Sequence, residues 1–184
     1  MSETTIFIFG MSLFIAGTVF GQTPLNEDLQ TVTSVDLNRY TGTWYEISRL
    51  PNRFQRDCAK NTTATYNLQD DGKIQVINRC VTAEGKEKSA TGIAEVVNTE
   101  TNAKLRVSFV QIFGLSLFWG DYWIIGLDPD YAYAVVGTPS RKYGWILSRS
   151  PQLTPDQETV INALLKEQGY NPDDFVKTPQ DDAS

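Results

Sequence analysis

Residues 38–47 read NRYTGTWYEI, with Gly42 and Trp44 two positions apart at the entry to a predicted strand. Two further motifs follow in the chain, DYWIIGLD at residues 121–128 and WILSR at residues 145–149, so that the three lie about 75 and about 25 residues apart. A glycine and a tryptophan at this spacing say little by themselves. Three motifs in this order, spread over most of the 184 residues, indicate one fold for the whole region between them.

Short segments rich in Val, Ile, Thr and aromatic residues surround these motifs, and turn residues interrupt them every 8–12 positions, which is typical of an antiparallel barrel or sandwich. The turn Asp70-Asp71-Gly72 predicts a hairpin because glycine tolerates positive φ. We expect strands at residues 42–50, 58–69, 73–81, 88–97, 103–110, 120–127, 131–138 and 143–149.

One amphipathic helix is predicted after the last strand. Thr154 provides an N-cap, Pro155 the first helical position and Gln157 a capping-box partner, and Gly169 ends the helix. Its apolar residues fall on one face, and they are Val160, Ile161, Leu164 and Leu165. We expect this face to pack on the outer wall of the sheet.

The three motifs together resemble the signatures of the lipocalins, closest to the branch of the bacterial lipocalins and apolipoprotein D. Residues 61–68 and the Asp-Asp-Gly turn are also similar to that branch. The resemblance implies an all-β fold, an eight-stranded antiparallel up-and-down β-barrel (the lipocalin calyx) with one C-terminal α-helix packed on its outside. It also implies structural roles for Gly42, for Trp44 as the plug of the closed end, and for Arg149 lying across that indole.

An eight-stranded barrel is wide enough to hold one small ligand. The resemblance and the alternation of side chains along strands predict five lining residues, which are Tyr66, Asn78, Phe109, Trp123 and Trp145. The alternative for each aromatic is a place in the barrel core. We expect the protein to bind and carry or scavenge a small hydrophobic molecule, a fatty acid or lysophospholipid.

The composition limits other functions. The formal net charge is −6, with no local cluster of basic residues, which disfavours nucleic-acid binding. The chain contains no histidine, so the commonest general base and metal ligand are missing, and we expect no catalysis, metal or cofactor. Two alternatives stay open: a protein-binding module, and an enzyme (isomerase or de-epoxidase) of the kind found among lipocalin relatives. We expect a monomer or weak homodimer.

The first 21 residues resemble a signal peptide, because the apolar run from Ile6 to Phe20 is too short to span a bilayer. An uncleaved anchor is the alternative. We expect an N-terminal arm at 22–35, the lipocalin domain at 36–178 and a disordered tail at 179–184. The protein is then exported, either secreted or periplasmic. Gln22 stands where bacterial relatives often carry a lipidated cysteine, so an outer-membrane anchor has no support in the sequence.

Cys58 and Cys80 are the only cysteines, and export favours a disulfide between them. Symmetric pairing about the 70–72 turn would place residue 58 opposite residue 84, so a bridge requires a bulge or an irregular start of the strand. Two free thiols are the alternative.

The segment 110–120 is the most apolar one after the leader. One interpretation is that it folds inward as a lid or extends both neighbouring strands. The other is an exposed tip that touches membranes, formed by Phe113, Leu115, Leu117 and Phe118.

Overall fold

The computed structural model describes residues 28–112 and 115–181. The predicted signal peptide, residues 22–27, Phe113 with Gly114, and the last three residues lie outside the described part. Among the described residues, no helix is both long and apolar enough to cross a membrane.

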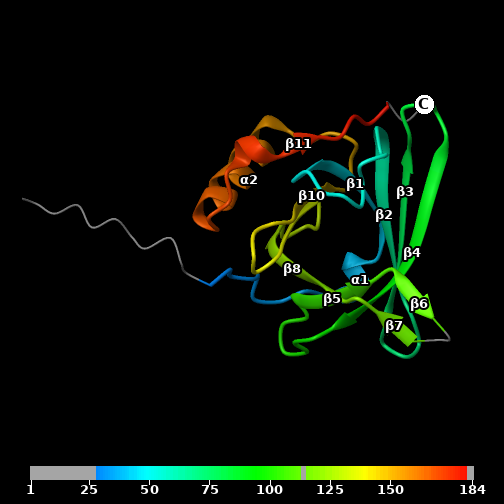
Figure 1. The fold of residues 1–184 in the computed structure, drawn as a ribbon. Coiled ribbons are helices and arrows are strands. Elements are labelled where there is room, and N and C mark those ends of the chain that lie inside the picture. The colour runs from blue at the N-terminus through cyan, green and yellow to red at the C-terminus, as the bar shows by residue number, and fades with distance from the viewer. Residues whose placement is uncertain (1–27, 113–114, 182–184) are drawn as a thin grey trace, which may run out of the picture.

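Eight antiparallel strands form a closed barrel (Figure 1). They are β1 (Gly42–Arg49), β2 (Lys60–Leu68), β3 (Ile74–Val81), β4 (Glu87–Val96), β5 (Lys104–Ser108), β8 (Gly120–Leu127), β9 (Tyr133–Gly137) and β10 (Gly144–Ser148). Each strand pairs with the next of this series, and the pairs Tyr45↔Ser148 and Arg49↔Trp145 join β1 to β10. The predicted eight-stranded up-and-down barrel is confirmed.

The predicted hairpin turn between β2 and β3 is present. Gly72 adopts a φ of 78°, and the backbone N–H of Gln69 donates to the carbonyl of Lys73 at 2.8 Å. All strand limits agree with the sequence prediction within two residues, and β5 ends at Ser108 rather than at residue 110.

The predicted 103–110 strand is interrupted by a bend. Beyond it, β6 (Val110–Ile112) and β7 (Leu115–Leu117) form a separate two-stranded hairpin. Their pair Val110↔Leu117 continues the register of the pair Val107↔Gly120 between β5 and β8. Ser108 supports the bend, because its hydroxyl lies within hydrogen-bond distance of the carbonyls of Val110 and Leu117, while Phe118 adopts a positive φ of 57°.

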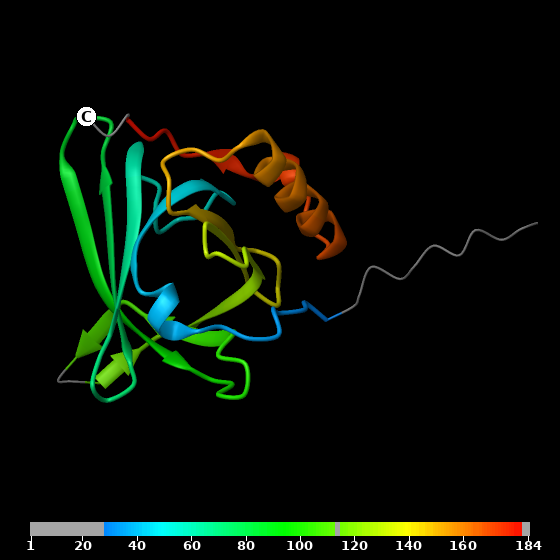
Figure 2. The same cartoon turned by 180° about the vertical axis from the view of Figure 1, so that it is seen from behind.

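The bend leaves part of β4 without a neighbour on one side. Residues 93–96 pair with β5, whereas in the described structure residues 87–92 pair only with β3. Figure 2 shows the β3–β4 pair rising above the rest of the wall. The barrel is therefore taller on this side than on the side of β5 and β8.

The helix α2 (Pro155–Glu167) lies against the outer wall, as predicted. Thr154 and Gln157 form a complete capping box, and Gly169 follows with a φ of 77°. Ile161 and Leu165 are buried against residues of β8, β9 and β10. Val160 is 54% exposed, so its predicted place on the packed face is wrong. The packed face of the helix is formed by Ile161, Leu164 and Leu165.

The segment before β1 closes one end of the barrel. Its backbone N–H groups at Val32 and Val35 donate to the carbonyls of Ile124 and Thr101. It continues into the short helix α1 (Leu37–Tyr40), and Val35 and Tyr40 join the buried core inside the barrel.

The C-terminal segment fills a gap in the wall. Its first part is a 3-10 turn, η1 (Pro172–Asp174), followed by β11 (Val176–Lys177), which pairs with the end of β1. The side-chain amide of Gln180 donates to the carbonyls of both Glu46 in β1 and Thr62 in β2. The expected disordered tail therefore needs correction over residues 179–181, because their polar groups satisfy strand edges that β1 and β2 leave open.

Candidate functional site

Register decides which side chains enter the barrel, because directly paired residues of antiparallel strands point to the same face. Trp44 pairs with Ala64, and Ala64 pairs with Asn78. Trp44 is fully buried in the interior core, so Ala64 and Asn78 also face inward. The same logic places Tyr66 and Val76 inside, since they pair with one another and belong to the same core.

The closed end is built around Trp44. The Arg149 guanidinium lies 3.8 Å from the centre of the indole ring, which is the arrangement that the resemblance implies. Arg149 also donates hydrogen bonds to the carbonyls of Arg39, Tyr40, Thr41 and Thr43. Gly42 has a φ of 93°, and a side chain there would crowd the Arg149 guanidinium. These residues bind one another, and both terminal nitrogens of Arg149 donate to backbone carbonyls.

Three tyrosine hydroxyls meet just inside this end, from α1, β2 and β8. Tyr122 lies at the centre, with its hydroxyl 2.8 Å from that of Tyr40 and 2.8 Å from that of Tyr66. Burial raises the pKa of Tyr66 to about 12 and raises the pKa values of Tyr40 and Tyr122 well above their ordinary range. We call these three residues the tyrosine cluster. At physiological pH all three phenols are neutral.

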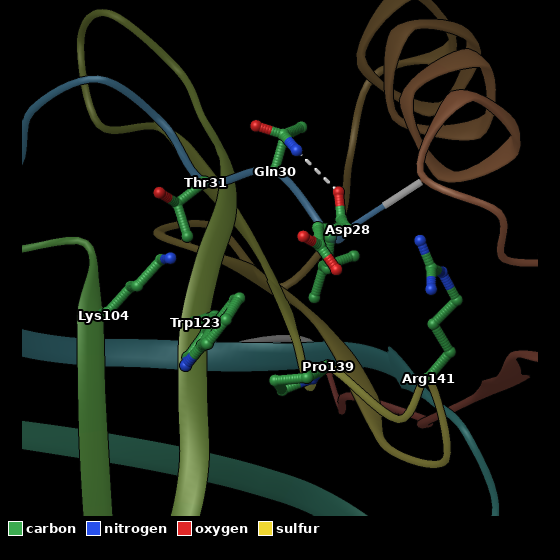
Figure 3. Close-up of a pocket in the computed structure, with 8 residues that line it drawn as sticks. Asp28, Gln30, Thr31, Lys104, Trp123, Pro139 and Arg141 are labelled. Atoms are coloured by element: carbon green, nitrogen blue, oxygen red, sulfur yellow. Dashed lines mark hydrogen bonds between the residues drawn. The ribbon is translucent and has the colours of Figure 1, made fainter. Parts of the chain in front are cut away.

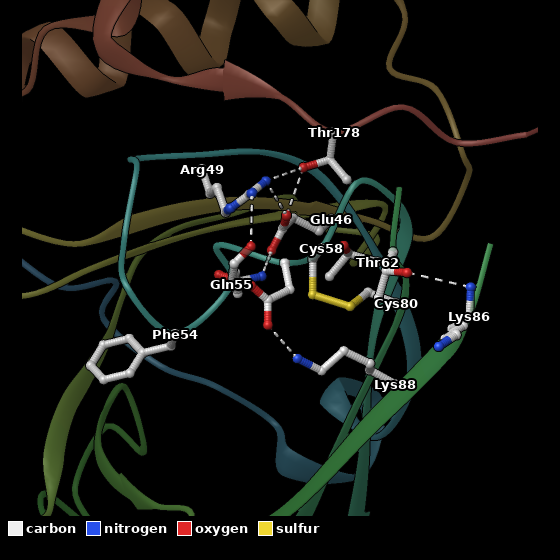
Figure 4. Close-up of a disulfide and its surroundings, with 12 residues drawn as sticks. Glu46, Arg49, Phe54, Gln55, Cys58, Thr62, Cys80, Lys86, Lys88 and Thr178 are labelled. Atoms are coloured by element: carbon white, nitrogen blue, oxygen red, sulfur yellow. Dashed lines mark hydrogen bonds and ion pairs between the residues drawn. A yellow bond between two sulfur atoms is a disulfide. The ribbon is translucent and has the colours of Figure 1, made fainter. Parts of the chain in front are cut away.

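A second polar group occupies the opposite, open end (Figure 4). Glu46 is only 3% exposed, and its carboxylate accepts hydrogen bonds from Arg49, Gln55 and Thr178. The indole N–H of Trp145 donates to the Gln55 side chain at 2.9 Å. The Arg49 Nε atom is buried without a hydrogen-bond partner among the described residues. We call Glu46, Arg49, Gln55, Trp145 and Thr178 the mouth cluster.

A β-bulge explains how the mouth cluster arises. The register between β1 and β10 shifts between Glu46 and Ser48, so that Glu46 pairs with Leu147 and Arg49 with Trp145. Without the shift, Glu46 and Arg49 would face opposite sides of the strand. The extra residue, Ile47, instead packs outside with the core beneath α2.

The loop 50–59 belongs to the same end and is fixed by a disulfide. Cys58 and Cys80 are bonded, with their Cα atoms 5.6 Å apart, which confirms the predicted bridge. The irregularity that the bridge requires is present, because the register between β2 and β3 shifts between Lys60 and Thr63. The Lys88 ammonium also lies 2.7 Å from the Asp57 carboxylate. The loop is therefore tied to both β3 and β4.

Four of the five predicted lining residues face the interior. Tyr66 lies in the tyrosine cluster, Trp145 in the mouth cluster, and Asn78 on β3 between them. Phe109 follows the bend after β5, beside Gly92 on β4, where an added Cβ would lie 2.7 Å from its ring. Whether these four residues contact a ligand stays a prediction.

Trp123 does not face the interior, and its assignment is corrected. It pairs with Lys104 on β5, whose ammonium lies 4.1 Å from the centre of the indole ring, and it packs with the core beneath α2. Its neighbour Tyr122 takes the inward position instead. The two residues alternate as strand residues do, and the sequence prediction chose the outer one.

The interior is densely packed at the closed end and looser toward the mouth. At the closed end Trp44 and Tyr40 are 0% and 3% exposed, whereas Phe109 is 41% exposed and Trp145 is partly exposed. Inward-facing apolar groups that keep exposed surface can be covered by an apolar ligand. The looser half of the interior is therefore the candidate binding site.

Two hollows lie outside the barrel. One, of about 480 Å³, is lined by Trp123, Lys104, Arg141 and residues 28–31 of the N-terminal segment (Figure 3). The other, of about 390 Å³, lies beside α2 and β11. Both have charged residues in their walls, and neither includes an interior residue named above. They do not support the binding of an apolar ligand.

The predicted apolar tip is partly exposed. Leu115 and Phe118 are 67% and 83% exposed, and Leu117 is half-buried. Phe113 lies outside the described residues. Ile112, which the sequence prediction did not include, is 48% exposed. The segment extends both strands as a hairpin and also presents apolar side chains to solvent.

Sequence reasoning missed most of the polar groups of the site. Tyr40 and Tyr122 stand inside two of the recognised motifs, so their positions were visible, although no pattern showed that their hydroxyls meet. Glu46 and Arg49 are brought together by the bulge, for which the sequence carries no clear sign. Gln55 lies in a loop with no periodicity.

Comparisons with known proteins agree on one family. The model of the Lipocalin-like domain matches residues 35–180. Temperature-induced lipocalin-1 of Arabidopsis thaliana is 38% identical over 159 residues, covering 85% of each chain. Outer membrane lipoprotein Blc of Escherichia coli K12 is 39% identical over 150 residues, covering 81% of each chain. The solved structure of insecticyanin from Manduca sexta is 25% identical with a TM-score of 0.68, covering 85% of this chain and 87% of that one.

Proposed function

Because this chain belongs to the lipocalin family, we propose that it binds one small hydrophobic ligand inside its barrel and carries or scavenges it unchanged. The observation that supports this most is the contrast between the packed closed end and the partly exposed apolar groups near the mouth, Phe109 and Trp145. A long acyl chain that buries about 400 Å² gains on the order of 10 kcal/mol before ordering costs.

We propose a fatty acid or a lysophospholipid as the ligand class, with its charged head at the mouth. The support is the polar character of that end, where Arg49 faces inward and its Nε atom has no hydrogen-bond partner among the described residues. A guanidinium N–H is a strong donor to a carboxylate or phosphate. The apolar chain would then extend past Phe109 toward the closed end.

The test is fluorescence titration of the purified protein with cis-parinaric acid, a fatty acid that brightens in apolar surroundings. Saturable binding of one molecule, weakened by Trp145→Ala and recovered unchanged by extraction, is the expected result. Trp123→Ala is the matched control, because its ring lies outside the barrel beneath Lys104. Absence of saturable binding would favour a protein-binding module, and a converted product would favour an enzyme.

We also propose export from the cytoplasm. The Cys58–Cys80 disulfide supports it, since such bonds persist in oxidising compartments. The name of the Escherichia coli relative places that protein at the outer membrane. Fractionation of cells that express the full chain tests the proposal, and recovery of the uncleaved protein in the cytoplasm would contradict it.

The β6–β7 hairpin is proposed to touch membranes. Its exposed apolar residues, Ile112, Leu115 and Phe118, lie close together in a segment that projects from the barrel wall. Such patches often mark interaction surfaces. We expect the protein to co-sediment with phosphatidylcholine vesicles and the variant Leu115→Asp/Phe118→Asp to stay in solution. Val97→Asp, at an exposed apolar residue outside the hairpin, is the control. Equal sedimentation of all three proteins would refute the contact.

A further inference from the structure

The tyrosine cluster has one more hydrogen-bond donor than its members can use. Three hydroxyls carry three protons, and the cluster contains two hydrogen bonds, both to Tyr122. Whether Tyr122 donates in one of these bonds or accepts in both, one O–H proton stays without an acceptor. None of the three hydroxyls makes another hydrogen bond to a described residue.

A buried donor without an acceptor is unfavourable, so the third proton calls for a partner that enters from the barrel. Tyr40 and Tyr66 are buried, but Tyr122 keeps some exposed surface while packing against the interior core. Tyr122 is therefore the member that an incoming group can reach. Burial holds the pKa values of the cluster above the physiological range, so the donor stays present there.

The partner should be neutral. A carboxylate buried at this end would need several donors or a nearby free cation. The cluster offers one proton, and both terminal nitrogens of the Arg149 guanidinium already bind backbone carbonyls. A carbonyl or hydroxyl oxygen needs only one donor and carries no charge to desolvate.

We propose that the preferred ligand carries a neutral oxygen, a carbonyl or hydroxyl, at its buried end, where it accepts a hydrogen bond from the tyrosine cluster. This rests on the proposed binding of a hydrophobic ligand and refines its class. A simple fatty acid would bind with its methyl end at the cluster and leave the third proton unmatched.

The experiment compares three probes by titration. They are 2-tridecanone with a carbonyl group at its second carbon, tridecane with the same chain and no oxygen, and diphenylhexatriene, a fluorescent hydrocarbon that reports the apolar interior. The protein variants are the wild type and the triple variant Tyr40→Phe/Tyr66→Phe/Tyr122→Phe. Tyr170→Phe is the control, because that tyrosine is also buried and hydrogen-bonded, but it lies outside the barrel beneath α2.

Relative to tridecane, the wild type and Tyr170→Phe should bind the ketone about 3- to 10-fold more tightly than the triple variant does, as one net hydrogen bond predicts. The C=O stretch of the bound ketone should lie below its frequency in hexane. The triple variant should lose both effects and still bind diphenylhexatriene. If the wild type binds diphenylhexatriene but the C=O stretch of its bound ketone is unshifted, the inference about the tyrosine cluster is overturned and the proposed function is not. No binding of any probe would overturn the proposed function itself.

Discussion

The Arg149 guanidinium lies 3.8 Å above the Trp44 indole and at the same time binds carbonyls on either side of Gly42. One side chain directly after the last barrel strand therefore fixes both the plug of the closed end and the entry of the chain into the first strand.

Arg149→Ala should lower the free energy of unfolding by about 2–3 kcal/mol, because it removes the cation–π contact and leaves several carbonyls unpaired. Ligand affinity should stay within about twofold, since both terminal nitrogens of Arg149 bind backbone carbonyls at the closed end. Urea unfolding and a parinaric acid titration measure the two quantities. Arg106→Ala is the control, because Arg106 covers the Trp119 ring at an exposed site. Loss of affinity at unchanged stability would contradict the assignment.

Trp145→Ala and Trp123→Ala should have opposite effects. Trp145 faces the interior beside the mouth cluster, so its truncation should weaken ligand binding by at least about fivefold. Trp123 lies outside under Lys104, so its truncation should lower stability by about 1–2 kcal/mol and leave affinity unchanged. Ligand titration measures the affinity of both variants, and thermal unfolding measures their stability. Weaker binding by Trp123→Ala would support the prediction from the sequence that Trp123 lines the interior.

Removing the disulfide with Cys58→Ala/Cys80→Ala should destabilise the protein by about 3 kcal/mol, the loop-entropy value for a closure of 22 residues. The bridge also holds the loop 50–59, in which Gln55 contacts Glu46 and Trp145. We therefore expect faster ligand dissociation, measured by stopped-flow exchange. Dithiothreitol treatment of the wild type should reproduce both effects, and an unchanged unfolding midpoint would argue against them.

The tyrosine cluster predicts a specific alkaline instability. Below about pH 10 the tyrosines are protonated in the folded and the unfolded chain alike, so they add no pH dependence. At higher pH the unfolded chain releases protons that the folded chain retains, since burial raises the pKa of Tyr66 to about 12 and those of Tyr40 and Tyr122 well above 10.

Stability should consequently fall as the pH rises through the folded pKa values, by up to about 1.4 kcal/mol per pH unit for each tyrosine. Ultraviolet titration of tyrosinate should show these groups ionising late and together with unfolding. The triple phenylalanine variant should lose that part of the dependence. Normal titration of all eight tyrosines in the folded protein would exclude the cluster.

The fold was accessible from sequence because its strong signals are local. The Asp-Asp-Gly turn, the capping box at Thr154 and the motif around Trp44 each specify their own surroundings, and the structure contains all three. The end of β5 at Ser108 could not be predicted from the sequence, since residues 103–110 have uniform strand character. The bend depends on the Ser108 hydroxyl and on the backbone of Phe118.

The site was less accessible because β8 is covered on both faces. Tyr122 packs inside the barrel and Trp123 packs beneath the covering segments outside, so aromatic residues stand on both sides of the strand. Alternation then gives two sets of residues but not which set faces inward. The mouth cluster required, in addition, a bulge at residue 47 that shifts every later residue of β1.

The insertion of residues 176–181 beside β1 has a consequence for the making of the protein. Thr178 and Gln180 contact Glu46 across 132 and 134 residues of chain, so these contacts cannot form until nearly the whole domain has been synthesised. Until then the edges of β1 and β2 near the mouth stay unpaired, and such edges invite association with other chains. Export before folding would keep nascent copies apart during this interval. The contacts of residues 176–181 with β1 and β2 would then form only after the chain has crossed the membrane.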